Sequence, residues 1–454
     1  MAQSVSMFLG MVFFIALHFI WSAVAAGIIT RQKRAPAIAA AWWLTIVSLP
    51  VVGTLLYLLA GWRTPIRATT PPPQQRASLQ ALITADCGFR CTQRNRLTLL
   101  HNGSNAFTAL ISTLQRATRS IHMEYYIFRD DRIGCAIAEI LIRKARSGVE
   151  VRVIYDAIGS WPLGGGLIGR LRKAGVEVHA YAPLQFPWFT PWAARRNHRK
   201  IVVVDGCIAF LGGINIAKYY IDGNNLGRWR DEHLRLEGDV VADLQQLFAA
   251  DWMSCHGKPF RTAHYISAHE IHNRLPIQIA TVQEGVSRHT LSNAFTAAII
   301  RARHSVQISS PYFLPPPALL DALRIAVRSG VKVQVMIPTC SDSAVADWVS
   351  DSYIWDLLEA GVEIFRYENG FLHAKLLVVD DTVASVGTAN MDYRSLEDNL
   401  EVTAFIYDPE AIRELSATFE RDLEVCIPLQ ANLWHPSGLR RTIGDLLRLI
   451  APLL

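Results

Sequence analysis

Two long apolar stretches open the chain, and their pattern predicts a pair of membrane-spanning helices. Residues 1–30 and Ala35–Trp62 contain no Asp, Glu, Lys or Arg. Each stretch is longer than the roughly 20 residues that a helix needs to cross the hydrocarbon core of a bilayer. The basic segment RQKR at 31–34 separates them and leaves room only for a tight turn. We therefore expect a transmembrane helical hairpin over residues 1–68, followed by a linker over residues 69–96.

Aromatic and ionisable side chains give information on how the hairpin would sit in a membrane. The candidates for anchors at the membrane surface, where aromatic residues gather, are Trp42, Trp43, Tyr57 and Trp62. A cleaved signal peptide is the alternative for the first stretch, but that stretch lacks the basic segment with which such peptides begin. His18 is its ionisable side chain, and we expect it to pack rather than to react. Basic residues lie at both ends of the second stretch, so the membrane side of the large domain stays open.

Beyond the linker, apolar blocks of strand length alternate with amphipathic segments of helix length. The segments SIHMEYYIF (120–128) and VEVRVIYD (149–156) are typical of strands, and CAIAEILIRKARSG (135–148) is typical of a helix that ends at a glycine. The same order returns as VQISSPYF (306–313), PALLDALRIAVRSG (317–330) and VKVQVMIP (331–338). Alternating strands and helices predict an α/β fold in layers. We place a first lobe at residues 97–264 and a second at residues 277–426.

The segment NHRKIVVVDG, Asn197–Gly206, combines a buried strand with polar residues at both ends. Its centre, IVVV, is typical of a strand covered on both faces. Alternation places His198 and Lys200 on one face, and Asp205 follows at the far end of the strand. Burial of polar side chains beside such a strand costs stability unless they are paired or used.

This polar pattern occurs twice. LHAKLLVVDD repeats the H-x-K-x4-D spacing with His373, Lys375 and Asp380. The match continues past the strand, where Gly212 and Asn215 correspond to Gly387 and Asn390. All the matched positions are 175 residues apart. The chain therefore contains a duplication of domain size, and we expect one catalytic site assembled from two similar halves.

Bulk composition adds a few limits. The chain has 454 residues, 51% of them hydrophobic, and its mean hydropathy of +0.19 is high for a soluble enzyme. A net charge of +6 suits anionic partners such as lipid headgroups or nucleic acid without choosing between them. Cys87 and Cys91 could form a disulfide in an oxidising compartment. No cysteine or histidine spacing indicates zinc, and we expect neither a metal nor another cofactor.

The duplicated H-x-K-x4-D-x6-G-x2-N motif resembles that of the phospholipase D superfamily, and together with the apolar hairpin the chain is similar to the bacterial cardiolipin synthases. The resemblance implies two tandem phospholipase D-like α/β/α lobes, related by a pseudo-two-fold axis, with both motifs at their interface. It also implies a multi-pass enzyme of the bacterial inner membrane. The implied reaction is phosphatidyl transfer from one phosphatidylglycerol to another, with release of glycerol.

Other functions remain open on the same scaffold. Hydrolysis, or transfer to another alcohol such as phosphatidylethanolamine, would use the same residues. The hairpin and the modest charge argue against a nuclease, and we expect no nucleic-acid partner. The intact duplicate motif argues against an inactive scaffold anchored in the membrane. The oligomeric state is left open.

Phosphodiester exchange needs a nucleophile, an acid for the leaving alkoxide, and positive charge near the phosphoryl oxygens. One motif histidine would attack phosphorus to form a phosphohistidine, and the other would protonate the leaving group and deprotonate the incoming alcohol. Lys200 and Lys375 would hold the phosphoryl oxygens, and Asn215 and Asn390 would donate amide hydrogen bonds. The resemblance implies that His198 is the nucleophile, whereas the near-symmetric sequence alone does not assign it.

A nucleophilic imidazole also needs a carboxylate to fix its tautomer. Glu401 and Asp231 follow the histidines of their own repeats by 28 and 33 residues. The resemblance implies the orienting role for Glu401, and we extend it across the repeat to Asp231.

The aspartates of the motif and the residue after its glycine need separate interpretation. The resemblance groups Asp205 and Asp380 with the catalytic residues, but their places at strand ends indicate that they secure a turn and link the lobes. The family commonly has Ser or Thr after the motif glycine. Thr388 fits that pattern and Gly213 does not, so we expect a hydroxyl contact in the first half to be lost or replaced.

Two further segments have two interpretations each. Residues 184–198, LQFPWFTPWAARRNH, place aromatic side chains before Arg195 and Arg196. They predict either a loop that admits lipid or a hydrophobic loop packed under the second lobe. Residues 433–454 predict a C-terminal amphipathic helix, which would lie on anionic lipid or dock on the catalytic lobe.

Overall fold

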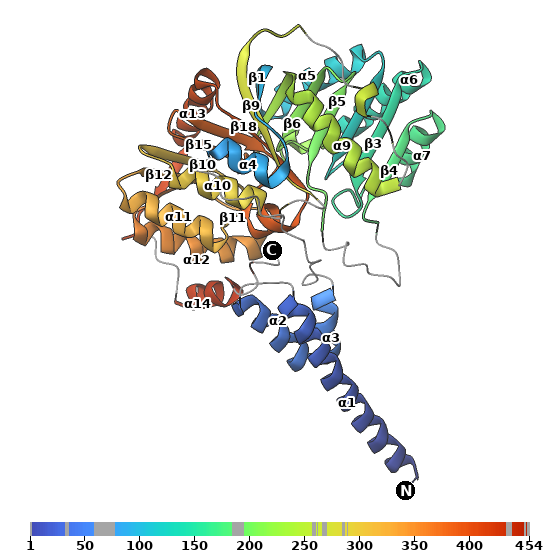
Figure 1. Cartoon of the computed structure of the whole chain (residues 1–454), viewed down its shortest axis with the longest axis vertical. Coiled ribbons are helices and arrows are strands. Elements are labelled where there is room, and N and C mark those ends of the chain that lie inside the picture. The colour runs from blue at the N-terminus through green and yellow to red at the C-terminus, as the bar shows by residue number, and fades with distance from the viewer. Residues whose placement is uncertain are drawn as a thin grey trace. The chain divides into compact units, whose positions relative to one another are not determined.

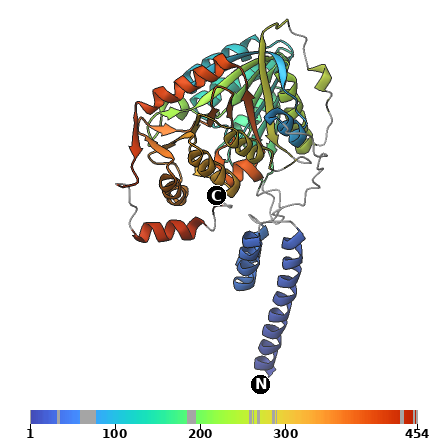
Figure 2. The same cartoon turned by 60° about the vertical axis from the view of Figure 1, so that its left-hand side comes forward.

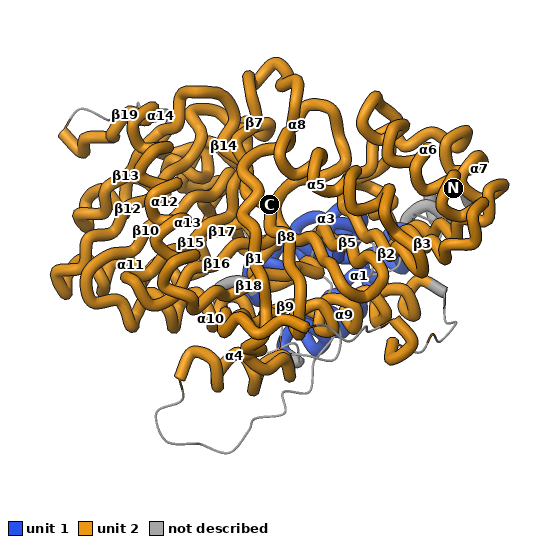
Figure 3. Tube along the Cα trace, turned by 90° about the horizontal axis from the view of Figure 1, so that it is seen from above, with its two compact units in different colours: residues 1–69, 184–195, 453 blue, residues 70–183, 196–452, 454 orange. Residues whose placement is uncertain are grey.

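The structure is a computed structural model that describes residues 2–31, 36–58, 78–183, 195–256, 260, 262–265, 270–283, 287, 289–432, 438–448 and 451. The chain divides into two compact units (Figure 3). Residues 1–69, 184–195 and 453 form the first unit, and residues 70–183, 196–452 and 454 form the second.

Among its described residues, the first unit contains the helices α1 (Ala2–Arg31), α2 (Pro36–Ser48) and α3 (Pro50–Leu56). Within the described residues, the stretch Gly10–Thr30 of α1 is the one helix long and apolar enough to cross a bilayer. The second predicted span is divided, because the backbone at Leu49 has φ −128° and ψ 79° directly before Pro50. A continuous spanning helix is therefore supported for the first stretch alone, and a multi-pass topology is not supported.

Contacts inside the first unit decide two of the predictions made for its side chains. Nε2 of His18 lies 3.1 Å from a backbone carbonyl oxygen of α2, so the predicted packing role is confirmed. Trp42 and Tyr57 are buried against each other, with ring centroids 5.6 Å apart. The prediction that these two rings are surface anchors is wrong, because they pack between helices. Trp43 is exposed, and Trp62 lies outside the described residues.

The second unit contains a fifteen-stranded sheet made of two halves with the same strand order, apart from one additional edge strand, β19 (Cys426–Leu429), in the second half. From its outer edge to the centre, the first half runs β4 (Glu177–Tyr181), β3 (Glu150–Asp156), β2 (Ser120–Tyr125), β5 (Lys200–Val204), β6 (Ile208–Gly212), β8 (Glu232–Gly238) and β1 (Thr92–His101). From the centre outward, the second half runs β9 (Arg274–Val282), β18 (Glu401–Ile406), β16 (Val383–Gly387), β15 (Leu376–Val379), β10 (Ser305–Ser309), β12 (Lys332–Pro338), β13 (Glu363–Tyr367) and β19 (Cys426–Leu429). Antiparallel pairing of β1 with β9 joins the halves, so the predicted lobes share one sheet.

Helices cover both faces of each half (Figures 1 and 2). In the first half, α5 (Asn102–Arg116), α6 (Arg132–Arg146) and α7 (Gly165–Lys173) lie on one face and α9 (Val240–His256) on the other. In the second half, α10 (Thr290–Ile300), α11 (Pro317–Arg328) and α12 (Ala344–Ala360) lie on one face and α13 (Pro409–Leu423) on the other. The predicted pair of α/β/α lobes is therefore confirmed.

Strand β5 illustrates why the motif segment is so apolar. All five of its residues are buried. Ile201 and Val203 belong to the core beneath α9, whereas Val202 and Val204 belong to the core beneath α5, α6 and α7. A strand between two helical layers has no solvent face, so the continuous apolar run replaces the alternation of a half-exposed strand.

The predicted linker is shorter than residues 69–96. Ser78 caps the short helix α4 (Leu79–Cys87), and β1 begins at Thr92. Leu79, Ile83 and Cys87 are buried in the core of the second unit, so this segment belongs to the catalytic fold. Cys87 and Cys91 are both free thiols.

The C-terminal helix α14 (Gly438–Leu447) packs against α12 (Figure 2). The guanidinium of Arg448, which directly follows the helix, lies 4.0 Å from the ring centroid of Tyr353 and donates to Asp356 at 2.7 Å. These contacts support the docked interpretation of the amphipathic segment. Residues 433–437 and 452–454 lie outside the described residues, as does 184–194, which carries the predicted aromatic loop.

Candidate active site

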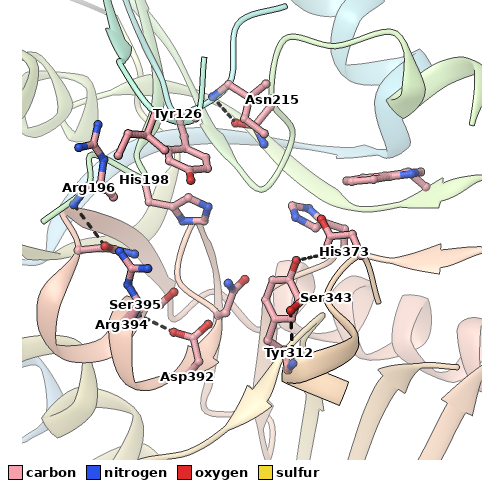
Figure 4. A pocket seen from close by; sticks show the side chains of 18 of the residues that line it. Tyr126, Arg196, His198, Asn215, Tyr312, Ser343, His373, Asp392, Arg394 and Ser395 are labelled. Carbon is pink, nitrogen blue, oxygen red and sulfur yellow. Dashed lines mark hydrogen bonds between the residues drawn. The ribbon is translucent and has the colours of Figure 1, made fainter. Parts of the chain in front are cut away.

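A cavity of about 540 Å³ is lined by residues of both lobes, including His198 from the first repeat and His373 from the second. Figure 4 shows the two imidazole rings projecting into the cavity from opposite sides and pointing toward each other. Asn215 and Asn390 line the same space. The duplication therefore contributes one histidine and one asparagine from each half to a single cavity.

Backbone pairing between the lobes places the two histidines. The N–H of His198 donates to the carbonyl oxygen of Leu400 at 3.0 Å, and the N–H of His373 donates to that of Arg230 at 2.7 Å. Around the second contact, strands β7 (Trp229–Arg230) and β14 (Phe371–Leu372) pair in parallel. The residue that follows each acceptor is a carboxylate, Glu401 or Asp231. Each repeat thus carries its acid directly to the histidine of the other repeat.

The imidazole–carboxylate pairs consequently cross between the lobes. Nδ1 of His198 lies 2.8 Å from Oε1 of Glu401, and Nδ1 of His373 lies 2.6 Å from Oδ2 of Asp231. Both carboxylates are fully buried. The sequence spacing did not assign either acid to a histidine, and these contacts place each acid beside the histidine of the other repeat. An Nδ1–H that donates to a carboxylate leaves Nε2 with its lone pair on the opposite side of the ring, toward the cavity.

Burial weakens the basicity of both rings. It lowers the pKa of His198, while the charge of Glu401 acts in the opposite direction. The pKa of His373 lies well below its ordinary value because of burial and the charges of Lys375, Lys200 and His198. Both imidazoles are therefore mainly neutral near neutral pH. An anionic phosphodiester between them would favour the protonated form.

The two motif lysines lie beside the histidines rather than in the cavity lining. Nζ of Lys200 donates to the carbonyl oxygen of His198 at 2.6 Å. Nζ of Lys375 donates to the carbonyl oxygen of His373 and lies 2.9 Å from Nδ1 of that ring. Burial lowers the pKa of Lys200 to about 7 and that of Lys375 to about 8. Their predicted contact with phosphoryl oxygens remains a prediction.

These pKa values predict an alkaline loss of activity. A lysine with a lowered pKa carries its charge below that value and loses it above, so we expect kcat/KM to fall as the pH rises through about 7 and 8. The measurement is a pH profile of kcat/KM with Lys375→Arg as the comparison. Arginine stays charged throughout, so the variant should show a lower maximum and a shallower fall, because the step near pH 7 from Lys200 remains and the step near pH 8 is lost. Identical alkaline falls in both enzymes would contradict the assignment to Lys375.

The two motif asparagines have different surroundings. The side chain of Asn215 accepts from the N–H of Ile127 at 3.1 Å and donates to the hydroxyl of Tyr220 at 2.9 Å. Among the described residues, Oδ1 of Asn390 is buried without a hydrogen-bond partner. Asn390 also hydrogen-bonds the carboxyl group of Asp392. Its donation to a phosphate remains a prediction, and the amide of Asn215 already has a protein partner.

Asp205 and Asp380 secure turns away from the cavity. The carboxylate of Asp205 accepts from the N–H groups of residues 118–120 at 2.7–2.9 Å, and that of Asp380 accepts from residues 303–305 at 2.8 Å. Both adopt positive φ, 54° and 48°, which is uncommon for residues other than glycine. Neither lines the cavity, and each bonds only within its own lobe in these contacts. These contacts support the expectation that both residues secure a turn, whereas a catalytic role and a link between the lobes remain predictions.

Gly213 departs from the family pattern because the carboxylate of Asp231 occupies the space of a side chain. A Cβ at Gly213 would lie 2.1 Å from Oδ1 of Asp231. In the second half, the hydroxyl of Thr388 donates to Oε2 of Glu401. In the first half, the N–H of Glu232 donates to Oδ1 of Asp231 at 2.8 Å instead. The predicted hydroxyl contact is thus replaced by a backbone amide.

Sequence reasoning missed Arg199, which lies between His198 and Lys200 of the first motif. Its fully buried guanidinium pairs with Asp251 of α9 and donates to Thr281 and to the carbonyl oxygen of Val282, both at 2.8 Å. Thr281 and Val282 belong to β9, so Arg199 ties the first motif to the second half of the sheet. Alternation along the strand, which turns residue 199 away from the face of His198, was the available signal.

Arg196 also has a role that its neighbours did not indicate. It is buried and forms an ion pair of 2.7 Å with Asp156, although it also lines the cavity.

Aromatic rings flank both histidines: the ring centroid of Tyr126 is 4.7 Å from that of His198, and the ring centroid of Trp229 is 5.0 Å from that of His373. Among the described residues, no group of three or more His, Cys, Asp or Glu side chains is placed to hold a metal ion.

Comparison with known proteins gives concordant results. The family described as "Cardiolipin synthase, PLD-like domain" matches residues 110–252 and 295–423. The chain is 42% identical to "Cardiolipin synthase 2" of Bacillus cereus over 359 residues, which cover 78% of this chain and 70% of that protein. It is 35% identical to "Cardiolipin synthase" of Oceanobacillus iheyensis over 490 residues, which cover 99% of each. The phosphatidylserine synthase structure from Haemophilus influenzae Rd KW20 covers 81% of this chain and 97% of its own, with a TM-score of 0.60 at 14% identity, which shows a shared fold.

Proposed function

The chain belongs to the phospholipase D-type cardiolipin synthases, a family of phosphatidyltransferases, and from that premise we propose that it joins two phosphatidylglycerol molecules into cardiolipin and releases glycerol. One phosphodiester is consumed and one is formed, so the exchange requires no nucleotide. The single observation that carries the proposal is the pair of histidines facing each other across one cavity, each backed by a buried carboxylate.

The first step divides the donor lipid. Nε2 of His198 attacks the phosphorus atom, forming a P–N bond as the P–O bond to the headgroup glycerol breaks. His373 gives a proton to the departing glycerol oxygen, so glycerol leaves with all three of its hydroxyl groups protonated. The product is a phosphatidyl–histidine phosphoramidate at His198, with His373 deprotonated. Covalent catalysis of this kind replaces one difficult displacement with two easier ones.

The second step reverses the first with a different alcohol. The terminal hydroxyl of a second phosphatidylglycerol occupies the place that glycerol left, and His373 removes its proton. The new P–O bond forms as the P–N bond to His198 breaks, which releases cardiolipin. Because the acid of the first step is the base of the second, His373 must hold and return one proton in each cycle.

The two carboxylates support this division of roles. Although burial alone would raise it, the pKa of Glu401 is lowered overall by the charge and hydrogen bond of His198, by Lys200 and by Thr388. Burial raises the pKa of Asp231 to about 6. A firmly ionised carboxylate favours the positive charge that develops on an attacking imidazole, and it stands behind His198.

The membrane setting belongs to the same proposal. Helix α1 offers one apolar span, and the substrates are bilayer lipids. We place the enzyme in the inner membrane of a bacterium, with its cavity at the level of the lipid headgroups.

A product assay tests the function. Full-length protein in detergent receives phosphatidylglycerol labelled in its headgroup glycerol, with chelator present and no nucleotide. We expect free glycerol and a four-chain phospholipid in equal amounts. Phosphatidic acid as the main product would indicate a hydrolase, and a mixed lipid formed on addition of phosphatidylethanolamine would indicate a different acceptor. Absence of glycerol release under all these conditions would contradict the proposal.

A further inference from the structure

The cavity is small in relation to the proposed substrates, and this inference rests on the proposed function. Its volume of about 540 Å³ falls within the range of about 300–1,000 Å³ that accommodates one small ligand. It can hold the reacting phosphate and glycerol groups but not the four acyl chains of two phospholipids. The chains must therefore stay in the bilayer during the reaction, and the mouth of the cavity must lie against the bilayer surface.

Exposed apolar side chains lie close in sequence to residues that line the cavity. In the first lobe, Ile158 lines the cavity and is itself exposed, and Trp161, three residues later, is 75% exposed. In the second lobe, Ser343 and Ala346 line the cavity at the start of α12. In both lobes, cavity-lining residues are therefore neighbours in sequence of exposed apolar side chains.

The second lobe supplies the larger part of this surface. Val345 and Trp348 are exposed and lie three residues apart, hence on one face of α12. Helix α14 lies beside them, since a Cβ at Gly444 would come within 2.9 Å of the carbonyl oxygen of Trp348. On α14, Leu446 is 60% exposed. A cationic group is present as well, because the exposed Arg441 lies 4.9 Å from the ring centroid of Trp355.

We propose that these residues form a docking face that enters the headgroup layer of an anionic bilayer and holds the cavity mouth against it. The docking face consists of Ile158, Trp161, Val345, Trp348 and Leu446. Tryptophan prefers the boundary between headgroups and acyl chains, and contiguous apolar surface beside a site marks an interaction surface. The face acts on lipid delivery rather than on bond making, since Trp161 and Trp348 do not line the cavity.

The test compares one variant on two forms of the same substrate. Full-length Trp161→Ala/Trp348→Ala enzyme is assayed in nanodiscs that contain long-chain phosphatidylglycerol, and in detergent with short-chain phosphatidylglycerol. We expect activity in the bilayer to fall about tenfold, while activity on the dispersed substrate stays within about twofold of wild type. Ile300→Ala/Ile325→Ala is the matched control, because its side chains are 57% and 54% exposed on α10 and α11 and do not adjoin the cavity. This control should retain both activities.

A direct measurement complements the kinetics. Brominated lipids in the nanodisc should quench part of the tryptophan fluorescence of wild type, and Trp161→Phe should remove a share of that quenching. Quenching that is identical in wild type and variant would overturn the proposal.

The outcomes separate docking from other roles. Unchanged bilayer activity of the double tryptophan variant would overturn the docking face, and so would an equal loss on both substrates, which would indicate damage to the site. A change in oligomeric mass of the variant would show that the face contacts a second copy, which also overturns the proposal. Failure of the wild-type enzyme to release glycerol from either substrate would instead refute the proposed function.

Discussion

Replacing either motif histidine with asparagine is expected to reduce glycerol release by about 10⁴-fold or more, because each imidazole makes or breaks a bond to phosphorus or moves the coupled proton. Asparagine keeps a similar length and polarity but supplies neither a nucleophile nor a group that titrates near neutral pH. The measurement is single-turnover and steady-state release of labelled glycerol from phosphatidylglycerol.

A substrate with a better leaving group separates the two histidines. A phosphatidyl ester of nitrophenol releases a stable anion that needs no proton, so loss of the general acid costs little in the first step. We expect His373→Asn to release one equivalent of nitrophenol in a burst, and His198→Asn to release none. The phosphatidyl group should then be found on the peptide that contains His198. A burst from His198→Asn with label at residue 373 would reverse the assigned roles.

A matched control guards against a general effect of removing histidine. His304 is exposed on a loop of the second lobe, so His304→Asn should keep wild-type activity and the same unfolding temperature. If either active-site variant retained more than about one hundredth of wild-type turnover on phosphatidylglycerol, the shared-site mechanism would be refuted.

The duplication was the most informative feature of the sequence, and it shows both the reach and the limit of sequence reasoning. The constant offset between the motifs around His198 and His373 predicted two equivalent lobes and a single shared site, and the strand order of the sheet has that symmetry. The same offset could not show which acid serves which histidine. In a pseudo-symmetric pair, an acid that follows its histidine in sequence can lie beside that residue or beside its symmetry mate, and spacing is identical in both cases.

The pairing became visible only through contacts between the lobes. The bond from His198 to the carbonyl oxygen of Leu400 fixes Glu401 beside that ring. Nothing local to residues 197–206 or 399–401 indicates this backbone pairing, because it depends on how the two halves of the sheet meet. Arg199 was missed for a related reason, since its partners Asp251 and Thr281 are 52 and 82 residues away.

Other differences have local causes. Asp205 and Asp380 were grouped with the catalytic residues because they belong to the same sequence motif. Their positive φ values let the carboxylates reach the backbone amides of residues 118–120 and 303–305. They therefore lie away from the imidazole rings of the two motif histidines. The division of the second apolar stretch at Leu49 follows from Pro50, whose ring disfavours a helical conformation in the residue before it. Hydropathy averaged over a long window does not record such a break.

The largest effect after the histidines is expected at Glu401. Glu401→Gln keeps the size of the side chain and a hydrogen-bond acceptor for Nδ1 of His198, but it removes the negative charge that stabilises the imidazole as it becomes cationic. We expect kcat to fall by about 10³- to 10⁴-fold, as for the loss of charge in other imidazole–carboxylate pairs. Glycerol release measures the loss. Asp231→Asn should cost less, about 10- to 100-fold, because Asp231 orients the imidazole that transfers the proton and not the one that attacks phosphorus.

The same variant tests whether the pairs cross between the lobes. Removing an anion beside an imidazole destabilises its protonated form, so Glu401→Gln should lower the pKa of His198 further and leave the titration of His373 unchanged. The pH dependence of modification by diethyl pyrocarbonate, read for each histidine by mass spectrometry, reports both values because the reagent attacks the neutral ring. If the pKa of His373 moved and that of His198 did not, the acid would serve its own repeat, and the crossed geometry that places one phosphorus atom between two lobes would be incorrect.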